Sequence, residues 1–95
     1  MKVIFRKFKI GCEVIAYFPE YLGTDTPDTC MSYMHHGQHG SAYADPRCTT
    51  PAMHTEYARL LKELRAIGYT DLRIARRFTH KDYLVRRTKI EEVTK

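Results

Sequence analysis

Histidine and glycine residues gather in residues 30–45, which read CMSYMHHGQHGSAYAD. Histidine donates or accepts protons near neutral pH and binds metals through a ring nitrogen, and glycine lets backbone N–H groups approach an anion closely. Three interpretations follow: a turn with polar side chains, a loop that contacts a small ligand or phosphate, or a metal site. The candidate contact residues in this segment are Tyr33, His35, His36, Gly37, Gln38, His39 and Gly40.

The spacing of this segment favours a two-residue hairpin turn at Gly37-Gln38, with Gly37 at positive φ. That register would place His36 opposite His39 and direct His35 to the other face of the sheet. The spacing H-H-x-x-H matches no common zinc motif, and neither a nucleophile nor a carboxylate stands beside the histidines. We therefore assign no catalytic residue, metal ligand or cofactor, and we expect a non-enzymatic protein.

Positive charge is concentrated at the two ends of the chain. The formal net charge is +5, and residues 13–45 contain no Lys or Arg. Arg73, Arg76 and Arg77 follow one another closely in a predicted strand. Such a cluster either contacts phosphates or an acidic protein, or forms a solvated face. If the first and last strands are neighbours, the molecule has one basic side.

Length and cysteine content indicate one small intracellular domain. The chain has 95 residues, and its three cysteines form no CxxC pair, which favours reduced thiols over a disulfide framework. The longest apolar run has the length of a strand, so we expect no membrane partner. The predicted location is the cytoplasm.

Hydrophobic periodicity predicts an α+β fold with the order β-β-β-α-β. Strands are expected at residues 3–9, 13–18, 30–35 and 72–78, with Leu72, Ile74 and Phe78 of the last one inward. A helix is expected from Thr50 and Pro51 to Gly68. Its apolar stripe at helical spacing comprises Met53, Tyr57, Leu60, Leu61, Leu64 and Ile67. The mainly antiparallel sheet would carry this helix on one face, as a two-layer sandwich. Residues 80–95 would follow the 1–79 domain as a basic tail, helical for a turn or two within 81–87.

The first two strands place apolar side chains on both of their faces. One helix cannot cover both faces of a sheet, so a loop, the tail or a second subunit must shield the other face. We predict a homodimer through that uncovered face.

The segments RKFKIGCEVIAYFPE, CMSYMHHGQHGSA and EYARLLKELRAIGYTDLRIARR together resemble a group of small accessory proteins of bacteriophages and bacterial mobile elements. The group shares the motif SYxHxGQHG, matched here by residues 32–40, and the resemblance extends to about residue 77. It implies a setting inside a bacterial host cell and supplies no residue roles.

Three hypotheses of function remain open. The first is an accessory protein that acts by occlusion, as an inhibitor of a host or defence protein, with residues 35–40 and the basic last strand as its contact surface. The second is a protein that binds or sequesters a nucleotide or nucleic acid through the same two regions. The third and weakest is a histidine- or metal-dependent enzyme resembling a phosphodiesterase.

Overall fold

The computed structural model describes residues 1–34 and 38–94. Within these residues, six strands and two α-helices form an α+β fold whose order and packing agree with a two-layer sandwich. The strands are antiparallel apart from one short parallel pair, so the predicted fold class is confirmed.

Four consecutive strands form an antiparallel meander, in which each strand pairs with the next. These strands are β1 (Lys2–Phe8), β2 (Val14–Leu22), β3 (Thr29–Met34) and β4 (Gln38–Tyr43). The turn between β1 and β2 uses positive φ at Gly11 and Cys12. Its position matches the predicted turn, and β4 adds a strand that the expected order lacked.

Two short strands share the remaining edge of β1. β5 (Thr49–Pro51) pairs antiparallel with Arg6–Phe8, and β6 (Arg73–Ala75) pairs parallel with Lys2–Ile4. The first and last strands are therefore neighbours, which is the condition stated above for one basic side. The predicted strand at 72–78 is shorter than expected, and Ile74 is 43% exposed rather than inward. A short 3₁₀ turn, η1 (Pro46–Cys48), precedes β5.

Helix α1 (His54–Ala66) begins later than the predicted Thr50-Pro51 start. Those two residues belong to β5, where pairing with β1 overrides the local helix-start signal. The helix instead begins after Met53, whose N–H donates to Glu56 Oε1 at 2.9 Å and so satisfies one free donor of the first turn. Gly68, at φ +122°, follows the last turn as predicted.

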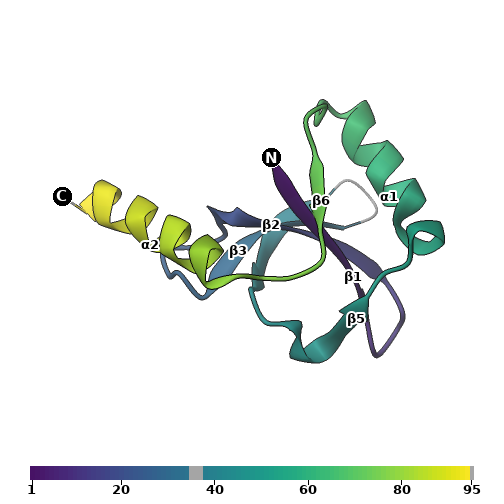
Figure 1. Ribbon diagram of the computed structural model, residues 1–95, viewed down its shortest axis with the longest axis horizontal. Coiled ribbons are helices and arrows are strands. Elements are labelled where there is room, and N and C mark those ends of the chain that lie inside the picture. Colours follow the sequence, from purple (N-terminus) through teal and green to yellow (C-terminus); the bar gives the residue numbers. More distant parts are fainter. Residues whose placement is uncertain (35–37, 95) are drawn as a thin grey trace.

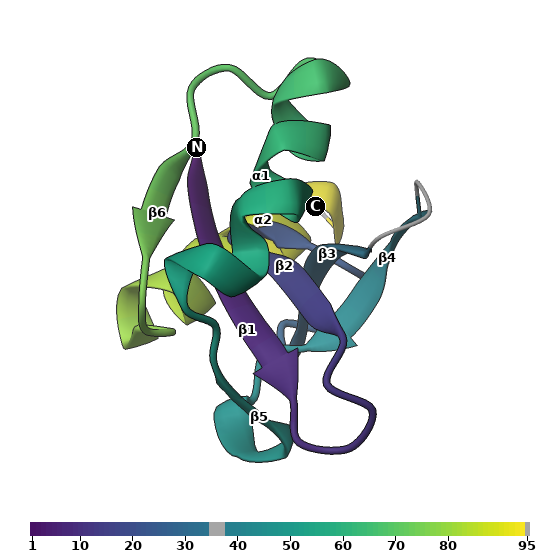
Figure 2. The same ribbon diagram turned by 90° about the vertical axis from the view of Figure 1, so that its right-hand side faces the viewer.

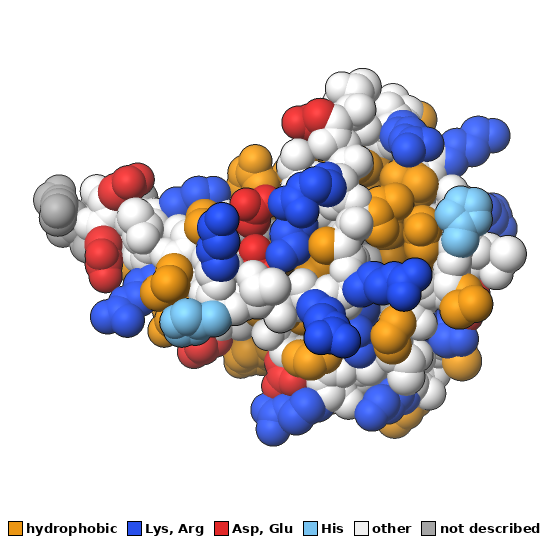
Figure 3. All heavy atoms as spheres, in the orientation of Figure 1, with side chains coloured by type: hydrophobic (Ala, Val, Ile, Leu, Met, Phe, Trp, Pro, Cys, Tyr) orange, Lys and Arg blue, Asp and Glu red, His pale blue; other side chains and the backbone are white. Residues whose placement is uncertain are grey.

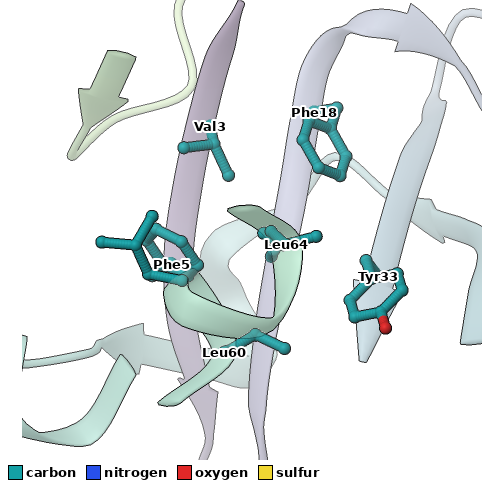
Figure 4. Close-up of a cluster of buried hydrophobic side chains, with 8 residues drawn as sticks. Val3, Phe5, Phe18, Tyr33, Leu60 and Leu64 are labelled. Carbon is teal, nitrogen blue, oxygen red and sulfur yellow. The ribbon is translucent and has the colours of Figure 1, made fainter. Parts of the chain in front are cut away.

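One hydrophobic core lies between α1 and the sheet (Figure 4). Leu60, Leu61 and Leu64 supply the buried stripe of the helix, and strand residues such as Val3 and Phe18 face them. Met53 and Ile67, which the helical spacing also placed on this stripe, are 68% and 51% exposed because they lie just outside the helix ends.

Helix α2 (His80–Thr94) lies on the opposite side of the sheet from α1 (Figure 1) and extends far beyond the expected turns at 81–87. Polar side chains hold its first half in place. Lys2 Nζ contacts Asp82 Oδ2 at 2.7 Å, and Arg86 donates to the carbonyl oxygens of Pro19 and Pro27 at 2.6 and 2.9 Å. Residues 80–94 are therefore a docked helix rather than a loose tail.

The second face of the sheet carries a smaller hydrophobic cluster. Ile4, Ile15, Tyr17 and Cys30 are buried there, and the Phe78 ring packs edge-on against Tyr17 at 5.0 Å. The segment leading into α2 thus shields part of the face that the sequence left uncovered. Neither described helix is long and apolar enough to cross a membrane.

Candidate functional site

The predicted site residues fall into two groups at opposite edges of the sheet. Tyr33, His39 and Gly40 lie on β3 and β4, and Arg73 lies on β6 with Arg76 and Arg77 just after it. Figure 2 shows β4 and β6 on opposite sides of the sheet. We expected one contact surface to join residues 35–40 to the basic strand. Among the described residues, His39 and Gly40 of β4 are separated from β6 by β3, β2 and β1.

His35, His36 and Gly37 lie outside the described residues, as does the conformation predicted for Gly37. The register on either side is fixed: Met34 pairs with Gln38, and Tyr33 pairs with His39. The two-residue turn that would place His36 opposite His39 is therefore wrong. His39 instead faces a buried tyrosine of β3.

A polar chain ties His39 to α1 and to the loop that follows it. His39 Nε2 lies 2.8 Å from the Tyr69 hydroxyl, and the Tyr33 ring meets the imidazole edge-on at 4.8 Å. Tyr33 in turn donates its phenol proton to Glu63 Oε1 at 2.6 Å. The hydrogen bond to Glu63, together with burial, raises the pKa of Tyr33 to about 12, so this phenol keeps its proton at neutral pH.

The side chains that make these contacts border a shallow pocket of about 470 Å³. It is lined by Tyr33, His39, Ile67, Gly68 and Tyr69. Its polar groups bond to one another, and both phenols carry ordinary structural roles: Tyr69 stacks on Phe18 at 5.2 Å. We therefore interpret these side-chain contacts as a structural support that holds β4 against α1 and against the loop after α1.

The arginine group belongs to a larger groove of about 580 Å³. It lies between β5, β6 and the start of α1, where two short strands pair with different parts of β1. Figure 3 shows a hollow between β6 and α1 in which hydrophobic side chains are exposed, with Lys and Arg side chains around it. The lining residues are Phe5, Arg6, Pro51, Ala52, Met53, His54, Tyr57, Ile74, Ala75, Arg76 and Arg77.

Aromatic rings packed against one another form the floor of the groove. The Phe5 and Tyr57 rings stack at 4.4 Å with an angle of 4° between their planes, and His54 packs edge-on against Tyr57 at 5.3 Å. Arg6 is buried, and its guanidinium turns away to donate to the Thr49 hydroxyl at 2.5 Å and carbonyl at 2.9 Å. The Arg6 guanidinium is thus occupied by hydrogen bonds within the fold.

The rim of the groove is cationic and partly apolar. Arg76 and Arg77 are exposed, and so are Met53 and Ile74. None of the described residues that line the groove is acidic. Among the predicted site residues, Arg76 and Arg77 are therefore the two that line this groove, whereas Arg73 lies beside it on β6.

Sequence reasoning missed the apolar part of the groove. Met53, Tyr57 and Ile74 were assigned to the core because they fall at helical or strand spacing. The two exposed ones, Met53 and Ile74, lie in positions that the pattern could not distinguish from buried ones, since the exposure depends on where α1 and β6 end.

The three cysteines are free thiols in different environments. Cys30 is buried, and burial raises the pKa of its thiol to about 11, which keeps it protonated. Cys12 and Cys48 are exposed free thiols. No group of three or more His, Cys, Asp or Glu side chains in residues 1–34 and 38–94 is arranged to hold a metal ion.

Comparison of the chain with protein-family models, with curated proteins and with solved structures gave no match in any of the three.

Proposed function

We propose that this chain is a non-enzymatic binding protein that occludes an acidic segment of a protein partner in the groove between β5, β6 and α1. The observation that carries the proposal is the combination in one groove of exposed arginines, exposed apolar side chains and a floor of stacked aromatic rings. A cationic rim attracts an acidic partner and orients it, and a desolvated apolar centre supplies binding energy.

The exposed apolar lining favours a protein partner over a nucleotide. Proteins that bind single-stranded nucleic acids expose aromatic rings on which bases stack. Here the Phe5 ring is only 5% exposed and its face is taken by Tyr57. Of the exposed side chains that line the groove, Met53 and Ile74 are thioether and aliphatic groups, which suit the apolar side chains of a peptide, and His54 is the exposed ring among the described residues of the lining.

The resemblance to phage and mobile-element accessory proteins suggests where such a partner is found. We propose a host or defence protein in a bacterial cell, which the chain inhibits by covering an acidic surface. Nucleotide or nucleic-acid binding at the same arginines is the competing proposal, and one experiment separates the two.

The test is selection from a random peptide library, followed by anisotropy measurements with the enriched peptides and with a single-stranded oligonucleotide. Arg76→Glu/Arg77→Glu reverses the charge of the rim. Lys62→Glu/Arg65→Glu is the matched control, because both side chains are exposed on α1 and neither lines the groove. The two double variants change the net charge equally, so a general charge effect would appear in both.

We expect acidic peptides with apolar anchors to be enriched. Their affinity should fall at least tenfold in the rim variant and by less than about threefold in the control, a gap of more than about 0.7 kcal/mol. Enrichment of peptides without acidic residues would overturn the proposal. So would oligonucleotide binding that exceeds peptide binding, weakens steeply with salt and is lost in the rim variant, since that is the behaviour of phosphate contacts.

A further inference from the structure

The outer edge of β4 offers a complete row of backbone hydrogen-bonding groups. Ala44 N–H donates to the carbonyl of Asp28 at 2.9 Å, in line with the β3–β4 register. Backbone groups of alternate residues point to opposite sides of a strand. Gly40 and Ala42 therefore bond to β3, in line with the bond from Ala44 to Asp28 just before that strand, whereas the N–H and C=O groups of the intervening residues point away from the sheet. Those residues are His39, Ser41 and Tyr43.

This edge lacks the features by which proteins protect exposed strands. The six residues of β4, QHGSAY, include no Lys, Arg, Asp, Glu or Pro. β3 is the one described strand that pairs with β4. Tyr43 is 73% exposed, and Ser41 and His39 are also exposed. The opposite edge differs, because β6 has three residues and carries arginines in and beside it.

We propose that β4 pairs antiparallel with β4 of a second copy of this chain, so that the two sheets become continuous across a two-fold axis. The charge distribution identifies the occupant. A copy that carries a net charge of +5 is repelled from the basic β6 edge, whereas the uncharged β4 can pair with itself without opposing like charges. This surface is distinct from the groove and does not depend on the function proposed for it.

The symmetric register places Ser41 opposite the partner's Ser41. Tyr43 then lies opposite the partner's His39, and each of the three outward residues supplies one donor and one acceptor to the joint. Tyr43 would cover its exposed ring against an imidazole that Tyr69 already holds in place at 2.8 Å. The polar chain at His39 thus presents a preformed surface for pairing.

The experiment is sedimentation velocity of the full chain over a range of concentrations. Ser41→Lys sets two lysines against each other at the axis, and Thr70→Lys is the matched control, because Thr70 is exposed and lies outside the sheet. Ser41→Pro is a second variant. This substitution removes an N–H that points outward and leaves the bonds to β3 in place. An edge strand tolerates proline at such a position. Circular dichroism confirms that each variant is folded.

We expect a monomer–dimer equilibrium whose dissociation constant rises at least tenfold in both Ser41 variants and stays unchanged in Thr70→Lys. Amide hydrogen exchange should show protection of Ser41 and Tyr43 that grows with protein concentration, while Gly40 and Ala42 are protected at every concentration. A wild-type chain that stays monomeric at its highest soluble concentration would overturn the proposal. A dimer that forms equally well in the Ser41 variants would overturn it too.

Discussion

The buried ion pair between Lys2 and Asp82 links the first strand to α2, and its removal should be costly. Both residues are less than 10% exposed, and Asp82 Oδ2 also accepts the Thr79 N–H at 3.0 Å. Burial raises the pKa of the Asp82 carboxyl, but the hydrogen bonds from Lys2 and Thr79 outweigh it and hold the pKa below its usual value. The carboxylate is therefore charged at neutral pH.

Asp82→Asn keeps the shape of the side chain and an acceptor for Thr79 but leaves the Lys2 ammonium buried without an opposite charge. Removing one partner of a buried ion pair costs about 3–5 kcal/mol. A chain of this length has a free energy of unfolding of about 5–14 kcal/mol. We expect Asp82→Asn to lower that free energy by about 3–5 kcal/mol and so to remove a large part of the stability.

Urea unfolding followed by far-UV circular dichroism measures the loss, with Lys2→Met and Lys2→Met/Asp82→Asn completing a double-mutant cycle. The double variant removes both charges and should return to within about 1 kcal/mol of the wild type. Because the folded pKa of Asp82 is lowered, its contribution is present above the usual carboxyl pKa of about 3.9 and is lost as pH falls through the folded value. A cost below about 1 kcal/mol for Asp82→Asn, or a double variant as unstable as the single one, would refute the reasoning.

Three further predictions concern the core and the sheet. Tyr33→Phe should reduce the fall in the free energy of unfolding that accompanies a rise in pH from about 10 to about 12, because the unfolded phenol ionises near 10 and the folded one near 12. Urea titrations at several pH values test this. Leu64→Ala, at a fully buried helix position, should cost about 2–5 kcal/mol in the same assay. A Cβ on Gly23 would lie 2.5 Å from a backbone oxygen of β3, whereas one on Gly40 would come no closer than 3.8 Å to Ser32 Oγ. Gly23→Ala should therefore lower the thermal midpoint far more than Gly40→Ala, and equal midpoints would contradict the packing described.

The elements that the sequence predicts well are those with their own hydrophobic period. The β1–β2 hairpin and the buried stripe of α1 carry such patterns, and both form where they were expected. β5 has three residues, too few for a period to show, and it forms because β1 offers an unpaired edge. β6 lies within the strand expected at 72–78, but three of those residues form it. α2 has no apolar stripe that would reveal it, since Asp82 and Arg86 dock it through polar contacts.

The site was harder to predict than the fold for a related reason. The pairing register of a glycine-rich strand is weakly specified by its sequence. The predicted partner of His39 was therefore His36, whereas the partner in the structure is Tyr33. The groove collects residues from β1, β5, α1 and β6, which lie far apart in the chain. Arg76 and Arg77 stood out as charges, but their apolar neighbours could be recognised only after the chain had folded.

β1 pairs with three other strands, and this has a consequence for the order in which the chain can fold as it is synthesised. β1 is made first, yet its pairing requires residues 49–51 and 73–75. At about 5–20 residues per second, the third of its partner strands follows roughly 4–14 s later. Until α1 has been synthesised, the apolar face of the β1–β2 hairpin has no helix to cover it. A nascent chain stalled before residue 73 should therefore lack the β1–β6 pair and remain sensitive to proteases.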